Sequence, residues 1–302
     1  MPARDLLLAL VVVLTWGFNF VVIKWGLVGL PPLLLASLRF AATVFPAVFF
    51  LRRPNLPWRY LIVYGLTWGL CQLGFLFSAM ANGMPAGLAS VVLQSQAFFT
   101  LIFAAVFLKE SFKHSQLIGL LIAGIGLWLI GSSHGQSMTL LGFIMTLLGA
   151  AGWAMGNVIL KQCTQQGLQF DVLAFMVWAS IAPLIGFVGL SLWLEGPQEI
   201  ATALQHFSMQ SLLAVLYQAI FAALLGMSLW NLLLKRHPTN LVAPFSLLVP
   251  WVGLSAAALL LNEQLLPQQW WGALLLMTGL VINIFGGQIR QLWRARKLAA
   301  QN

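Results

Sequence analysis

Charge and cysteine are both scarce in this chain. Only 7% of the 302 residues are charged and six are acidic, whereas about 25% of an ordinary soluble domain is charged. The two cysteines, Cys71 and Cys163, are too few for a disulfide framework or a cysteine-based metal site. The sequence has no G-x-x-x-x-G-K-[ST] loop, so it cannot hydrolyse ATP by that means. A large soluble catalytic domain and a self-contained nucleotide-driven pump are therefore excluded.

Hydrophobic residues make up 61% of the chain, and the mean hydropathy is +0.93. Runs of about 20 apolar residues are long enough to span a bilayer as helices. Breaks of Pro, Gly and charge divide the chain into ten such runs, so we expect an all-α polytopic membrane protein. The expected spans are 6–27, 32–51, 60–80, 86–108, 116–131, 139–160, 172–194, 212–234, 241–261 and 270–287. The first run has no cleavage pattern and is expected to be a retained helix.

The basic residues predict one orientation in the bilayer. Every Lys and Arg except Lys24 and Arg39 lies at the span ends and loops on the side of the N-terminus. The positive-inside rule therefore predicts that both termini are cytoplasmic. The net charge of +9 is then orientation charge, and the expected partners are the lipid bilayer and a small molecule, with no nucleic acid.

The sequence contains an internal repeat. Residues 83–131 align without a gap to 236–284 at an offset of 153, which matches Glu110 with Glu263. A second match at an offset of 137 places Trp16 to Lys24 against Trp153 to Lys161. Each half has five spans, an odd number, so the second half enters from the opposite side. We expect two inverted repeats, residues 1–135 and 136–302, with a substrate site between them as in many secondary transporters.

Several stretches resemble the EamA branch of the drug/metabolite transporter superfamily. They are Trp16-Gly-Phe-Asn-Phe-Val-Val-Ile-Lys24, Leu38-Arg39-Phe40, Gly83-Met-Pro-Ala-Gly-Leu-Ala-Ser90, Gln94-Ser-Gln-Ala-Phe-Phe-Thr100, Val242-Ala-Pro-Phe-Ser-Leu-Leu-Val-Pro250 and Met277-Thr-Gly-Leu280. The resemblance implies a ten-helix fold around a central cavity in the bacterial inner membrane. It also implies export of small amino-acid metabolites, of the cysteine and O-acetylserine class.

Polar side chains at membrane depth are the candidates for substrate binding, because each is costly there without a role. Trp16 with Asn19, and Trp153 with Asn157, lie at helical spacing in matched spans. Their rings and amides suit a small zwitterion, although interhelical bonding accounts for them equally well. Arg39 is a candidate for a substrate carboxylate, or it caps backbone carbonyls.

The amides of the third, fourth and eighth spans are further candidates. Ser90 and Gln94 share one helical face, and Gln96 with Thr100 lies on another, so both Gln face one cavity only if the helix is distorted. We favour Gln94. Gln72 and Gln218 are equally consistent with ligand binding and with helix packing. Lys24 and Lys161 end matched segments on opposite membrane faces. They either attract anionic groups at the two vestibules or extend toward the membrane surface, and we favour the second.

The titratable groups constrain the mechanism. The six acids and four His fall at span ends or in loops, so a proton relay through side chains is disfavoured, and facilitated export or exchange is expected. Their scatter also argues against a membrane-embedded enzyme, and no cofactor is expected. A passive channel, a structural role, other amino acids or drug-like cargo remain alternatives, and the oligomeric state is open.

Overall fold

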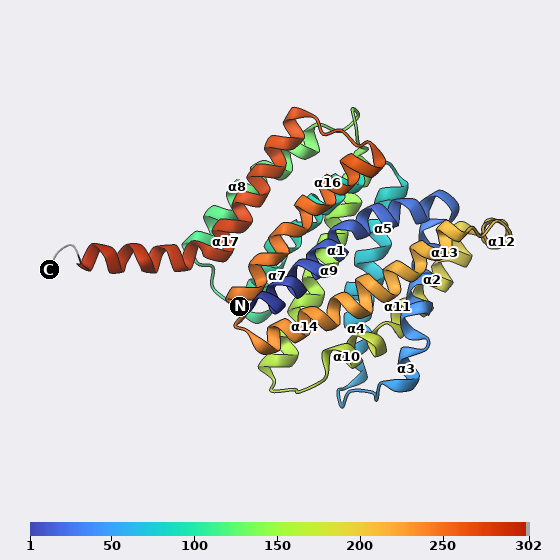
Figure 1. Ribbon diagram of the computed structural model, residues 1–302, viewed down its shortest axis with the longest axis horizontal. Coiled ribbons are helices and arrows are strands. Elements are labelled where there is room, and N and C mark those ends of the chain that lie inside the picture. The colour runs from blue at the N-terminus through green and yellow to red at the C-terminus, as the bar shows by residue number, and fades with distance from the viewer. Residues whose placement is uncertain (300–302) are drawn as a thin grey trace.

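The computed structural model describes residues 1–299, and these residues form a bundle of helices (Figure 1). Ten helices in it are long and apolar enough to span a membrane, as predicted. The first five spans are α1 (Ala3–Gly29); α2 (Pro32–Val44) with α3 (Ala47–Phe50); α4 (Trp58–Tyr64), η1 (Gly65–Cys71) and α5 (Gln72–Ala81); α6 (Ala86–Val92), η2 (Leu93–Ser95) and α7 (Gln96–Leu108); and α8 (His114–Ser132).

The other five spans follow the same order. They are α9 (Leu140–Gln165); α10 (Val172–Ala179), α11 (Ile181–Leu190) and η3 (Ser191–Glu195); α13 (Met209–Leu216), η4 (Tyr217–Leu225) and α14 (Gly226–Arg236); α15 (Thr239–Val242), η5 (Ala243–Leu248) and α16 (Val249–Leu261); and α17 (Pro267–Ala299). The structure differs from the expected spans at two places. Helix α12 (Pro197–Gln205) lies between the seventh and eighth spans, in a stretch that no expected span covers. α9 continues past residue 160, the expected end of its span, and Cys163 is buried within it.

Polar contacts between span ends define two faces of the bundle. On the N-terminal face, Asp5 pairs with Arg236 at 2.9 Å and joins α1 to α14. On the opposite face, the carboxylate of Glu195 accepts hydrogen bonds from the backbone N–H groups of Leu33 and Leu34 at 2.6 and 3.0 Å. This carboxylate occupies the N-terminus of α2, where the unpaired N–H groups of a helix favour negative charge.

The contact between α8 and α17 displays the symmetry of the two repeats. A Cβ on Gly119 would lie 2.6 Å from the Gly279 oxygen, and one on Gly126 would lie 2.6 Å from the Gly272 oxygen. Gly272 and Gly279 are the repeat equivalents of Gly119 and Gly126, so each glycine meets the equivalent of the other. Such exchange is the mark of a two-fold relation between two antiparallel elements. The two helices lie side by side at the edge of the bundle in Figure 1.

The two repeats pack differently at their fourth helices. Residues 86–93, at the opposite face, are all buried. Of the matched residues 239–246, at the N-terminal face, residues 241–246 are partly or fully exposed except for Val242, as are residues 247 and 248. Because the segments are equivalent in the repeat, the difference arises from packing. The opposite face is therefore closed around residues 86–93, and the N-terminal face is looser around 241–248.

Candidate functional site

Arg39 is a buried cation without a polar partner. Its side chain extends from α2 and is 6% exposed, and its Nε and Nη1 atoms make no hydrogen bond. Within residues 1–299 it forms no ion pair, and its guanidinium carbon lies 5.1 Å from the centre of the Phe40 ring. A buried charge lacking a partner is strongly unfavourable. The site therefore favours an anion beside Arg39.

Arg39 borders a small enclosed cavity of about 10 Å³. Its walls include Trp68 of η1, Ser180 after α10 and Ala223 of η4, so the third, seventh and eighth spans meet the second span there. The volume is close to that of a single water-sized probe. A metabolite therefore needs the surrounding helices to move apart in order to enter.

Three amide side chains in the spans also have buried atoms without partners. They are Asn19 through Oδ1, Gln72 through Oε1 and Gln218 through both amide atoms. Trp16 donates from Nε1 to the Ala222 oxygen at 3.0 Å, so these two residues lie at the same depth. Asn19 and Gln218 each lie about one helical turn from that pair, toward the opposite face, because their spans are antiparallel. Gln72 lies one helical turn after Trp68 and is likewise nearer the opposite face. Because Trp68 and Ala223 line the Arg39 cavity, the three amides form a band about one helical turn from the depth of that cavity, toward the opposite face.

Irregular helix occurs at equivalent positions around this band. η1 and η4 are π-helical, and residues 65–71 correspond to 218–224 at the repeat offset of 153. π-Helical stretches are rare and recur at functional sites. Their presence in both repeats, at the segments that carry Trp68, Gln218 and Ala223, indicates a shared local geometry around the cavity.

A second polar group lies nearer the N-terminal face and is internally bonded. Asn157 donates from Nδ2 to Gln96 Oε1 at 2.9 Å and to Thr100 Oγ1 at 3.3 Å. Gln94 donates to the Ser246 oxygen at 3.2 Å. Gln94 lies within the 3₁₀ turn η2 and Gln96 begins α7, so the helix carries the distortion that both side chains need in order to bond inside the bundle. The sequence preference for Gln94 alone therefore missed Gln96.

The other predicted residues make packing contacts. Ser90 donates to the Gly87 oxygen at 2.6 Å and is buried against Gly253. The Trp16 ring lies 5.4 Å from that of Trp230. Trp153 is half-buried and packs against the core. None of these three residues lines the Arg39 cavity.

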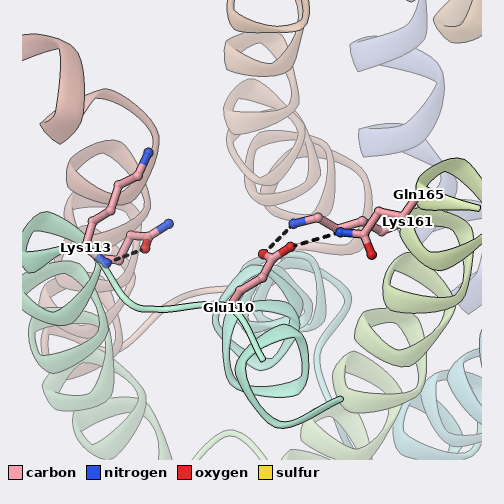
Figure 2. Close-up of polar contacts among 5 residues, drawn as sticks. Glu110, Lys113, Lys161 and Gln165 are labelled. Carbon is pink, nitrogen blue, oxygen red and sulfur yellow. Dashed lines mark hydrogen bonds and ion pairs between the residues drawn. The ribbon is translucent and has the colours of Figure 1, made fainter. Parts of the chain in front are cut away.

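The two matched lysines have partners inside the protein. Lys24 donates to the Met80 oxygen at 2.9 Å, and Lys161 pairs with Glu110 at 2.6 Å (Figure 2). Met80 lies at the end of α5 and Glu110 lies just past the end of α7, so each lysine reaches a partner at the end of a span. Sequence reasoning also missed Asn231, whose Nδ2 is buried without a partner. Its position in an amphipathic stretch of α14 was the only available signal.

A family model matches most of the chain. The EamA-like transporter family model covers residues 4–132 and 140–285, which correspond to two successive five-helix segments. The chain belongs to the EamA-like transporter family. Its members are transporters rather than enzymes, which agrees with the fold, the ten spans and the paired repeats.

Curated EamA relatives are similar over nearly their whole length. A protein of Salmonella typhimurium (strain LT2) named "Probable amino-acid metabolite efflux pump" is 46% identical over 97% of this chain and 99% of its own. An Escherichia coli (strain K12) protein of the same name is 46% identical over 95% and 96%. A solved crystal structure, 15% identical, covers 93% of this chain and 96% of its own with a TM-score of 0.59, which shows the fold alone. These relatives support a membrane exporter of amino-acid metabolites.

Proposed function

We propose that this EamA-family protein exports small amino-acid metabolites of the cysteine and O-acetylserine class by alternating access. The observation that carries the proposal is the buried, unpaired Arg39 guanidinium, with a band of unpartnered amides about one helical turn further toward the opposite face. A substrate carboxylate supplies the acceptor that Arg39 lacks, through charge-assisted hydrogen bonds. The oxygens of Asn19, Gln72 and Gln218 can accept from the substrate ammonium group.

The remaining candidates have supporting roles in the proposal. Trp16 and Trp153 form aromatic walls, and Asn157, Gln94 and Ser90 hold the fourth helix of the first repeat against its neighbours. The two repeats, residues 1–135 and 136–302, rock against each other to open the cavity. The last three residues lie outside those that the structure describes.

The orientation of the basic residues supports the direction of transport. By the positive-inside rule the N-terminal face is cytoplasmic in a bacterial inner membrane. That face is the looser one around residues 241–248. The arrangement therefore suits loading of cargo from the cytoplasm, followed by release at the opposite face. Because no described carboxylate faces the Arg39 cavity, we favour facilitated export or exchange over a side-chain proton relay.

Transport by proteoliposomes tests this function. Uptake of labelled cysteine and O-acetylserine is measured under reducing conditions, with and without a pH gradient and with preloaded substrate. Competition by the methyl ester of O-acetylserine, which lacks the carboxylate, and by N-acetylserine, which lacks the ammonium group, separates the two ends of the substrate. We expect saturable uptake, strong preference for the free carboxylate and no dependence on the gradient. Equal competition by the methyl ester contradicts the role of Arg39, and uptake of other cargo alone contradicts the substrate class.

A further inference from the structure

Glu110 and Glu263 are equivalent residues on the same local backbone. Each follows a residue with left-handed conformation, Lys109 at φ 56° and Asn262 at φ 53°. Their backbone N–H groups donate to the equivalent oxygens of Ala104 and Ala257, at 3.4 and 3.3 Å. The two carboxylates therefore start from the same geometry, one on each face of the bundle.

The partners of the two carboxylates nevertheless differ. Glu263 accepts from the backbone N–H groups of Ala86 and Gly87, at 2.7 and 2.9 Å, where the fourth span begins. Glu110 instead accepts from Lys161 Nζ at 2.6 Å and from Gln165 Nε2 at 3.3 Å (Figure 2). One face thus carries a carboxylate on a helix start, and the other carries an ion pair.

The equivalent lysines show the same asymmetry. Lys24 is the repeat equivalent of Lys161, yet it donates to the Met80 oxygen and forms no ion pair with Glu263. The required neighbours are present, because α1 packs along α16 as α9 packs along α7. Lys24 is therefore on a helix adjacent to the one that ends at Glu263.

The arrangement at each face follows its packing. The face where Glu263 binds the helix start is closed, with residues 86–93 all buried. The face where Glu110 binds Lys161 is looser, with 241–248 partly exposed except for Val242. A carboxylate at a helix start brings the ninth-span end onto the fourth span, whereas the Glu110 carboxylate is held by side chains of the sixth span.

We propose that Glu110 and Glu263 are paired switches that exchange partners when the transporter changes state. In the alternate state Glu263 leaves Ala86 and Gly87 for Lys24. Glu110 leaves Lys161 for the backbone N–H groups at residues 239 and 240, the equivalents of 86 and 87. Each lysine thereby stabilises the open state of its own face. The proposal rests on the alternating access proposed above and names the side-chain contacts that change between its two states.

Matched lysine substitutions test the exchange. Lys24→Gln and Lys161→Gln each keep a hydrogen-bond donor and remove one charge. The reporter is a single cysteine at Ala257, which is 1% exposed and whose Cβ lies 3.3 Å from the position of a Cβ on Gly87. It is placed in a variant lacking Cys71 and Cys163, and its alkylation by a soluble maleimide is timed in detergent without substrate.

The exchange predicts opposite shifts from the two variants. Lys161→Gln weakens the observed state and should speed alkylation by about 1.4- to 5-fold, since exposed ion pairs contribute about 0.2–1 kcal/mol. Lys24→Gln removes the ion pair of the alternate state and keeps a donor for the Met80 oxygen of the observed state, so it should slow alkylation by a similar factor. The double variant should return close to the starting rate. The exposed Arg52→Gln serves as the control and should leave the rate unchanged.

Two results overturn the proposal: shifts in the same direction from both lysine variants, or no shift from either. If the Ala257 reporter does not fold, Leu254→Cys replaces it, because Leu254 is 7% exposed and also faces Gly87. The assay needs no substrate, so its outcome is independent of whether cysteine or O-acetylserine is the cargo. A failed transport assay with the expected alkylation shifts contradicts the substrate class and leaves the switch standing.

Discussion

Replacing Arg39 by methionine should stabilise the substrate-free protein while weakening transport. Two guanidinium nitrogens are buried without partners, and each unsatisfied buried donor costs about 1–3 kcal/mol. Removing them gains more than the loss of the contact with the Phe40 ring, which is worth about 0.5–2 kcal/mol. We therefore expect the free energy of unfolding to rise by about 1–4 kcal/mol, with a higher Tm by tryptophan fluorescence.

The same substitution removes the proposed partner of the substrate carboxylate. A hydrogen bond to a charged group contributes about 1.5–3 kcal/mol, so the apparent affinity for O-acetylserine in proteoliposomes should fall by about 10- to 150-fold. Arg59→Met is the matched control, because Arg59 also contacts a ring, that of Tyr60, but lies exposed. It should change neither Tm nor affinity appreciably. A lower Tm with unchanged transport in Arg39→Met would refute the reasoning, since that result marks a structural arginine.

Three further substitutions have clear expected outcomes. Gly279→Ala places a Cβ 2.5 Å from a backbone oxygen of α8 and should cost about 1–3 kcal/mol, whereas Gly124→Ala, with nothing within 4 Å, should not lower the Tm in detergent. Glu195→Gln weakens the carboxylate contact at the start of α2 and should lower the Tm by an amount corresponding to about 0.5–2 kcal/mol. The exposed Glu199→Gln should leave the Tm unchanged, and an equal fall in Tm for both variants would contradict the contact. Asn157→Ala breaks the bonds to α7 and should reduce the maximal transport rate more than the apparent affinity; a loss of affinity alone would instead place Asn157 at the substrate.

Hydrophobic run length and repeat spacing in the sequence predicted most of the fold. The ten spans are confirmed because a run of about 20 apolar residues has few alternatives to a membrane helix. The repeat offset of 153 also located the glycines that cross between α8 and α17. Periodicity could not locate α12, because a short helix in a polar connection lacks a long apolar run.

The site was only partly predictable for a different physical reason. The sequence around an isolated Arg, Asn or Gln in a span does not show whether its side chain contacts a neighbouring helix or a cavity. Only the tertiary structure separated Arg39, Asn19, Gln72 and Gln218, which keep buried atoms without partners, from Asn157, which is bonded to α7. The 3₁₀ turn at η2 likewise depends on packing, and it changed which glutamines face inward.

The sequence by itself determined the ten spans, the two matched halves and the positions of the charges, because these follow from local hydrophobicity and from comparison of the chain with itself. Which partner each charge takes was decided by the tertiary structure alone. Glu110 and Glu263 are equivalent in sequence, yet one binds a lysine and the other a helix start. The reason is that each partner depends on how the helices pack at its face, and the two faces pack differently around these equivalent residues.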